Sequence, residues 1–136
     1  MAQQANQPLP NGHLLEEYTI DRQLSLGGFS IVYLATDTAG RQVAIKEYLP
    51  NSLALRTRGD VTPLISAEHL GAFRYGMKCF FEEGRALARL SHPNVIRVLN
   101  FFRANETVYM VMEYEHGRTL QEFIQKNRRY FRKFRR

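Results

Sequence analysis

The stretch "LSLGGFSIVYLATDTAGRQVAIKEYLP", which runs from Leu24 to Pro50, decides the predicted fold. Residues 29–37 are rich in β-branched and aromatic side chains, and residues 42–49 form a similar run after a short polar turn. Such runs favour strands, and a short polar turn with a glycine favours a hairpin between them. Residues 17–25 supply another strand before the glycine pair. We therefore predict a three-stranded antiparallel meander.

The rest of the chain predicts one long helix, two more strands and a final helix. Residues 72–91 carry apolar side chains at helical spacing, and Pro93 disfavours helix just before it. Residues 94–102 and 106–114 are predicted to be strands around a short turn, and residues 119–136 have an amphipathic helical pattern. The predicted class is α+β: a five-stranded antiparallel sheet with one long packed helix and a C-terminal amphipathic helix.

The segment between residues 50 and 72 has no regular pattern. Gly59 and Asp60 are typical turn residues, so a small hairpin is expected around them. Ser66 is predicted to cap the long helix, with Glu68 in its first turn.

Composition narrows the class of protein. The 136 residues are 44% hydrophobic, which suits one compact domain, and no apolar run is long enough for a membrane span. Residues 1–13 are polar and are expected to form a disordered leader rather than a secretory signal. The lone cysteine, Cys79, excludes an internal disulfide, and we expect a cytoplasmic protein without a metal site.

The net charge of +6 comes from one end of the chain. Residues 126–136 hold seven of the 19 Lys and Arg residues and no acidic residue, which leaves 12 basic against 13 acidic residues before them. The body of the protein is therefore nearly neutral, and the basic pI is no evidence for nucleic-acid binding by the whole domain.

Two features of the opening stretch suggest an anion site. The pair Gly27-Gly28 would let the backbone approach a phosphate and direct its N–H groups at it. Strand alternation puts Lys46 on the same face as Ala44, where a small neighbour leaves room for a flat ring. Each feature also has an ordinary explanation: an unremarkable hairpin turn, and a solvated lysine on an edge strand.

Two later features point to the same region. Glu83 shares a helix face with Phe80 and Leu87, so a carboxylate lies within an apolar stripe, where it needs a partner such as a strand lysine. The apolar strand "YMVM" ends at Met112 and is followed by "EYEHG", which offers backbone groups at a cleft edge. The alternatives are a structural ion pair without function and an ordinary strand end.

Taken together, four segments of the sequence resemble a known protein family. The segments "GGFSIVYLA", "VAIK", "EEGRALARLSHPNVIRV" and "YMVMEY…GRTL" occur in an order and spacing that resemble the N-terminal lobe of a eukaryotic-like (Hanks-type) bacterial Ser/Thr protein kinase. The resemblance runs from about Tyr18 to Gln125. It implies an ATP-binding kinase N-lobe over residues 14–118, with residues 119–136 as the helix that begins a C-lobe and a basic tail.

The resemblance also implies roles for particular residues. Lys46 would hold the α- and β-phosphates of ATP and would be oriented by an ion pair with Glu83, so these two are the implied catalytic residues. Met112 would be the gatekeeper. The remaining implied nucleotide contacts are the adenine sandwich of Leu24, Val32 and Ala44; the phosphate loop of Ser25, Leu26, Gly27, Gly28, Phe29 and Ser30; the adenine-edge contacts of Glu113 and Glu115; and the ribose contact of Thr119.

The chain departs from the family pattern in two ways. The family loop is GxGxxG, whereas here Ser25 and Ser30 replace the first and third glycines, and the segment before the long helix is longer than usual. Nothing in the 136 residues resembles the HRD and DFG motifs, which supply the base and the Mg²⁺ ligands. We expect ATP and Mg²⁺ as cofactors, Mg²⁺ ligands in a missing C-lobe, and no catalysis by this chain alone.

Three functions are left open by the sequence. The first is the ATP-binding lobe of a kinase that phosphorylates protein Ser/Thr residues, the second a pseudokinase or scaffold, and the third a basic amphipathic binder of membranes or nucleic acid through the tail. The expected partners are ATP and a protein substrate. A further expectation is self-association through an exposed apolar stripe on the C-terminal helix.

Overall fold

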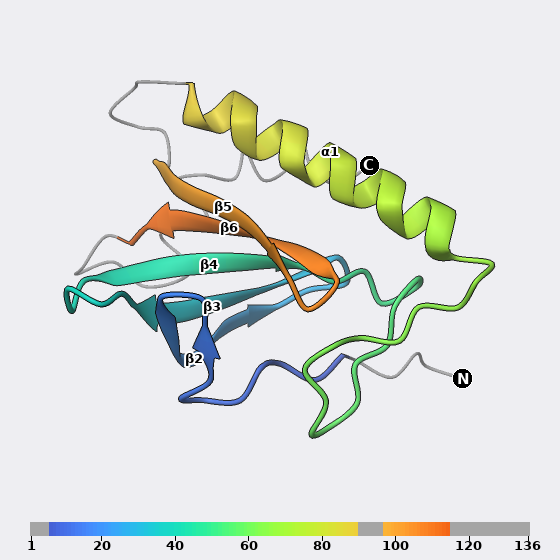
Figure 1. Cartoon of the computed structure of the whole chain (residues 1–136), viewed down its shortest axis with the longest axis horizontal. Helices are drawn as coiled ribbons and strands as arrows, with labels where there is room; N and C mark the ends of the chain where they lie inside the picture. The colour runs from blue at the N-terminus through green and yellow to red at the C-terminus, as the bar shows by residue number, and fades with distance from the viewer. Residues whose placement is uncertain (1–5, 90–96, 115–136) are drawn as a thin grey trace.

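The computed structural model describes residues 6–89 and 97–114, which form one antiparallel sheet and one long helix (Figure 1). The C-terminal helix expected over residues 119–136 lies outside this range. In chain order the elements are β1 (Leu14–Leu15), β2 (Tyr18–Leu26), β3 (Ser30–Thr36), β4 (Gln42–Tyr48), α1 (Leu70–Ala88), β5 (Val98–Ala104) and β6 (Thr107–Glu113).

The sheet has the order β1-β2-β3-β4-β6-β5, and all its pairs are antiparallel. The meander predicted from the opening stretch is confirmed as β2, β3 and β4. The sheet has six strands rather than the predicted five, because Leu14 and Leu15 pair with the start of β2. A two-residue strand is too short to show an alternating pattern, so periodicity cannot reveal it.

Helix α1 packs against one face of the sheet through Phe73, Phe80 and Leu87, which are buried. The predicted start of the helix is wrong. The cap residue is His69, which makes no side-chain capping bond, and the first turn contains no acidic residue. The reason is local: the backbone N–H of His69 donates to the carbonyl of Ser66, so Ser66 opens a turn that precedes the helix.

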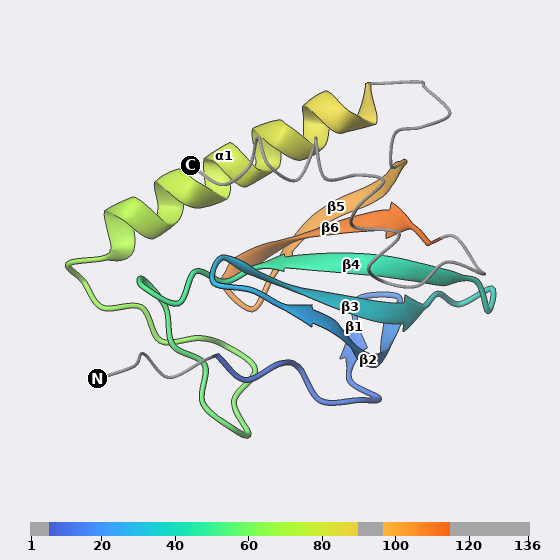
Figure 2. The ribbon, with the colours of Figure 1, turned by 180° about the vertical axis from the view of Figure 1, so that it is seen from behind.

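The opposite face of the sheet is covered by two irregular segments, residues 6–13 and residues 50–66 (Figure 2). Residues 6–13, expected to belong to a disordered leader, instead contribute to the core through Leu9, which is only 1% exposed. The hairpin expected around Gly59 is confirmed in minimal form as one antiparallel bridge between Leu55 and Leu64, with Gly59 at a φ of +92° in its turn.

A buried ion pair holds these segments to the sheet. The guanidinium of Arg56 donates to both carboxylate oxygens of Glu47 on β4, at 2.6 and 2.8 Å, and both side chains are fully buried. The hydroxyls of Tyr33 and Tyr109 also donate to this carboxylate, and Tyr33 accepts from the backbone N–H of Leu9. Burial, together with the Glu47 charge, raises the pKa of both tyrosines well above its usual value, so they keep the protons that they donate.

We expect Arg56→Met to lower the free energy of unfolding by about 3–5 kcal/mol, because it leaves the Glu47 carboxylate buried without its counter-ion. Urea unfolding measures the change, and the matched control is Arg58→Met two residues away, which is exposed and should stay within about 0.5 kcal/mol. Adding Glu47→Gln to Arg56→Met should restore part of the loss. Equal stability of the Arg56 and Arg58 variants would contradict this role for the ion pair.

Close approach of α1 to the sheet depends on a glycine. A Cβ atom at Gly76 would lie 1.9 Å from the hydroxyl of Tyr48, which is packed between Phe73 and Phe80 and donates to the carbonyl of Phe73. A Cβ atom at Gly71, in the first turn of the same helix, would meet nothing within 4 Å. Alanine substitutions at the two glycines therefore distinguish the steric cost of an added side chain from its effect on helix propensity.

Gly76→Ala should destabilise the fold by about 1–3 kcal/mol, because Tyr48 must leave its place and its hydrogen bond. Gly71→Ala should instead be neutral or stabilise by up to about 1 kcal/mol through helix propensity. Thermal and urea unfolding of the two variants measure both values, and a stabilised Gly76→Ala variant would show that α1 does not pack this closely.

Candidate functional site

The glycine-rich loop is the predicted phosphate loop of residues 25–30. It joins β2 to β3 as a tight turn. The backbone N–H of Gly27 donates to the carbonyl of Ser30 at 2.9 Å, and Leu26 pairs with Ile31 across the turn. The side chain of Phe29 is 53% exposed at the tip. The loop is therefore a closed backbone turn whose tip projects from the sheet.

The tip is also bound by the segment that follows β4. The backbone N–H of Leu49 donates to the carbonyl of Phe29, and that of Asn51 donates to the carbonyl of Gly28, both at 2.9 Å. Within the described residues, the N–H groups of Gly28 and Phe29 donate to no other group. The carbonyls of Gly28 and Phe29 are thus engaged, whereas the N–H groups of these two residues have no backbone acceptor in the described part of the chain.

Buried apolar side chains from neighbouring strands lie together on the face that carries Lys46. Val32 on β3 lies opposite Lys46, and Met112 on β6 lies opposite Ala44. Since side chains directly opposite in a sheet share a face, the structure brings these predicted residues together. Leu24 lies at an irregularity in the pairing of β2 with β3 and is half-buried.

The alternative explanation, a solvated lysine, would require Lys46 to lie on an edge strand. It does not. It lies on β4 between β3 and β6 and is only 7% exposed. Its Nζ atom is 5.5 Å from the centroid of the Phe80 ring on α1, a favourable cation–π geometry. The cation therefore lies between the sheet and the helix that carries Glu83.

Glu83 is half-buried on α1. Its burial raises its carboxyl pKa to about 8, although the charge of Lys46 acts in the opposite direction. The ion pairs within 4.0 Å in the described part of the chain do not include Lys46 with Glu83. The direct ion pair implied by the resemblance is therefore not formed, and burial favours the neutral form of the Glu83 carboxyl.

The remaining predicted residues are divided by the described range. Glu113 ends β6 with an exposed side chain, and its backbone N–H donates to the carbonyl of Arg97 at 2.9 Å. Glu115 and Thr119 lie outside the described residues. Of the predicted adenine-edge contacts, only Glu113 therefore has a described position.

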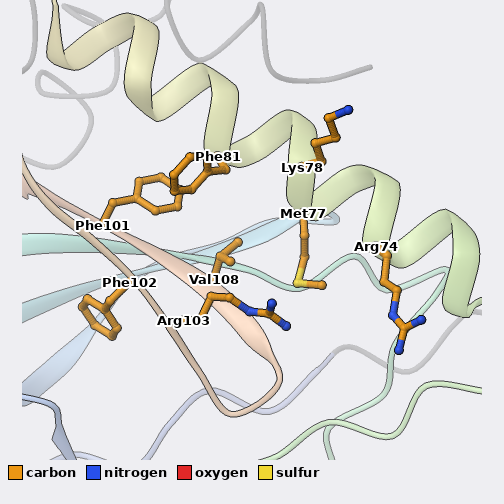
Figure 3. Close-up of a pocket in the computed structure, with 8 residues that line it drawn as sticks. All are labelled: Arg74, Met77, Lys78, Phe81, Phe101, Phe102, Arg103 and Val108. Atoms are coloured by element: carbon orange, nitrogen blue, oxygen red, sulfur yellow. The ribbon is translucent and has the colours of Figure 1, made fainter.

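Sequence reasoning misses a groove of about 560 Å³ between α1 and the β5–β6 hairpin (Figure 3). It combines apolar and basic side chains: Arg74, Met77, Lys78, Phe81, Phe101, Phe102, Arg103 and Val108. The helical pattern alone assigns Met77 to the core-facing stripe, and the exposed Phe81 beside Phe80 is the available signal for the groove. None of the predicted nucleotide contacts lines it.

The described residues contain no group of three or more His, Cys, Asp or Glu side chains that could hold a metal ion. No helix within the described ranges is long and apolar enough to cross a membrane.

Comparison with known proteins identifies the family of the chain. The profile of the protein kinase domain family matches residues 18–134. Among curated relatives, serine/threonine-protein kinase PrkC of Bacillus subtilis is 29% identical over 111 residues, 81% of this chain and 14% of its own length. Probable serine/threonine-protein kinase PknB of Lactococcus lactis is 30% identical over 114 residues, 82% of this chain and 15% of its own length.

Solved structures with a similar fold are also found. The apo form of PpkA-294 has a TM-score of 0.76 and 40% identity, covering 87% of this chain and 42% of that chain. The kinase domain of Mycobacterium tuberculosis PknI, at 21% identity and a TM-score of 0.56, covers 79% of this chain and 36% of that chain, and it supports the fold alone. The chain thus spans a small part of its curated relatives and less than half of PpkA-294. With a family match over most of its length, this chain belongs to the protein kinase domain family.

Proposed function

We propose that this chain is the ATP-binding part of a serine/threonine protein kinase that transfers the γ-phosphate of ATP to protein Ser or Thr residues. The observation that carries the proposal is the position of Lys46: a buried cation on a central strand, beside an apolar surface and below a helix with a carboxyl group. The curated relatives described above, both serine/threonine-protein kinases by name, support the same class.

The proposed orientation of ATP follows from the positions of the apolar and the charged side chains of the site. The apolar side chains of Val32, Ala44 and Met112 suit a flat adenine ring, which stacks on apolar surface without needing charge. The triphosphate then extends toward Lys46 and toward the open N–H groups of the glycine-rich loop. A cation and backbone N–H groups stabilise the phosphate charges by charge-assisted hydrogen bonds.

Glu83 is proposed to position Lys46 rather than to touch ATP. A protonated carboxyl holds an ammonium group weakly, so the positioning requires Glu83 to lose its proton and approach the cation. In the structure, burial favours the neutral form of Glu83, so the proposed positioning includes this loss of a proton. Closure of α1 toward β4 would form the pair.

The described residues are proposed to hold ATP, and the transfer of its phosphoryl group needs further groups. In kinases that step uses Mg²⁺ and a carboxylate that accepts the substrate proton. The described residues contain no group of three or more His, Cys, Asp or Glu side chains that could hold a metal ion. We therefore assign to them only the binding and the orientation of ATP.

The other functions considered from the sequence have different consequences. A pseudokinase or scaffold would retain the fold without needing ATP, and Ser25 and Ser30 in the loop are the feature that favours it. Membrane or nucleic-acid binding through the tail, and self-association through the C-terminal helix, rest on residues outside the described range. They stay predictions.

Lys46→Met should weaken binding of ATP to this chain by about 10–100-fold, because it removes a charge-assisted phosphate contact. Adenosine has no phosphates, so its affinity should change less than about 2-fold. Titration calorimetry with both ligands measures the effect. The control Lys78→Met removes an exposed lysine from α1 and should leave both affinities unchanged. A wild-type chain that binds neither ligand would favour the scaffold.

Glu83→Gln should stabilise the fold at pH 8 but not at pH 5. The folded state keeps the Glu83 proton up to about pH 8, whereas the unfolded chain loses it near its ordinary value of 4.5, so wild-type stability falls as pH rises between these values. Glutamine carries no such penalty.

Because Glu83 is half-exposed, the gain at pH 8 should be on the order of 1 kcal/mol, or about 3–5 °C in Tm. Thermal unfolding at pH 5 and pH 8 measures it, and Glu82→Gln, an exposed neighbour, serves as control. A Tm difference that is the same at both pH values would show that the Glu83 pKa is not raised.

A further inference from the structure

The tip of the glycine-rich loop is connected to the N-terminal segment. The loop carbonyls of Gly28 and Phe29 are bound by the backbone of Asn51 and Leu49. The side chain of Asn51 is bound in turn: the Nδ2 of Asn6 donates to its Oδ1 at 3.0 Å and also to the carbonyl of Ala54 at 3.1 Å. Asn6 is 2% exposed, so these contacts are made away from water.

The same asparagine is joined to the buried ion pair. The Oδ1 of Asn6 accepts from the backbone N–H of Arg56 at 2.6 Å, and the Nε of Arg56 donates to the carbonyl of Gln7 at 2.8 Å. The Arg56 guanidinium binds Glu47 on β4, the residue next to Lys46. A continuous series of hydrogen bonds therefore links β4, Arg56, Asn6 and Asn51 to the loop tip.

We propose that Asn6 is a positioning residue for the phosphates of ATP. It fixes the segment that follows β4, and this segment holds the carbonyl of Gly28, whose planar peptide unit also contains the N–H group of Phe29, so that this N–H group keeps one orientation for an anion. The inference rests on the proposed ATP site and goes beyond it, because Asn6 acts on the loop only through Asn51 and the residues beside it.

The physical basis is preorganisation. A phosphate is repelled by carbonyl oxygens and attracted by N–H groups, so a loop tip that rotates freely must be ordered when ATP binds. Serines at positions 25 and 30 already restrict the loop relative to glycines. The tether adds a second restriction, and its loss should weaken contacts to phosphate without changing the apolar surface proposed for adenine.

The test compares Asn6→Ala with Asn11→Ala, an exposed asparagine of the same N-terminal segment. We expect Asn6→Ala to weaken ATP binding by about 5–30-fold and to change adenosine binding less than about 2-fold, whereas Asn11→Ala changes neither. Amide hydrogen exchange of Leu49 and Asn51, followed by NMR in the unliganded chain, should be faster in Asn6→Ala only.

Asn51→Ala removes the other side of the same contact and provides a second variant if Asn6→Ala folds poorly. The double variant should lose no more ATP affinity than Asn6→Ala alone, because Asn51→Ala removes a contact that Asn6→Ala has already broken. Additive losses would overturn the inference.

The outcomes distinguish this inference from the proposed function. A wild-type chain that binds no ATP overturns the proposed function and the role of Asn6 in phosphate binding together. Wild-type binding with equal losses of ATP and adenosine in Asn6→Ala overturns the positioning role alone and leaves a purely structural one. Unchanged exchange of Leu49 and Asn51 in Asn6→Ala shows that no tether exists.

Discussion

The buried ion pair between Glu47 and Arg56 is the interaction on which the rest of the structure depends. A fully buried carboxylate is tolerated only when its charge and its lone pairs are satisfied, and here one guanidinium and two tyrosine hydroxyls do so. Arg56 comes from an irregular segment, and its hydrogen-bond partners include Asn6 and Gln7. The Glu47 carboxylate needs these partners because it is buried. It thereby holds in place two segments without regular secondary structure, residues 6–13 and 50–66.

Strand β4 carries two adjacent charged residues, Lys46 and Glu47. Their side chains lie on opposite faces of the sheet and have different surroundings. Glu47 is satisfied completely, as expected for a group whose task is to hold its surroundings. On the other face, Lys46 and Glu83 form no direct ion pair, and burial raises the pKa of Glu83 to about 8. Burial without a direct salt bridge to a cation disfavours the charged form of the Glu83 carboxyl, and this is the cause of its raised pKa.

Short-range rules of alternation and turn chemistry were sufficient to predict the meander, the face of Lys46 and the place of Glu83 among apolar helix residues. The same rules could not find the partner of Glu47, because Arg56 lies nine residues away across a segment without periodicity. Nor could they show that residues 6–13 are ordered, since one apolar side chain, Leu9, and one amide, Asn6, make the contacts that bury a polar segment. The composition of residues 6–13 describes the segment as a whole, whereas its burial depends on the contacts of Leu9 and Asn6.

Coverage of both faces explains why the central strands show continuous rather than alternating burial. Residues 31–35 of β3 and 43–48 of β4 are buried throughout, with α1 packed over β5 and β6 and approaching Lys46 of β4 through Phe80, and with the irregular segments on the other face. A sheet exposed on one side would place polar residues at every second position. The irregular segments are therefore part of the hydrophobic core. They hold the shape of the sheet from the face opposite the helix, which leaves the helix-facing side to carry the cation and the carboxyl group of the site.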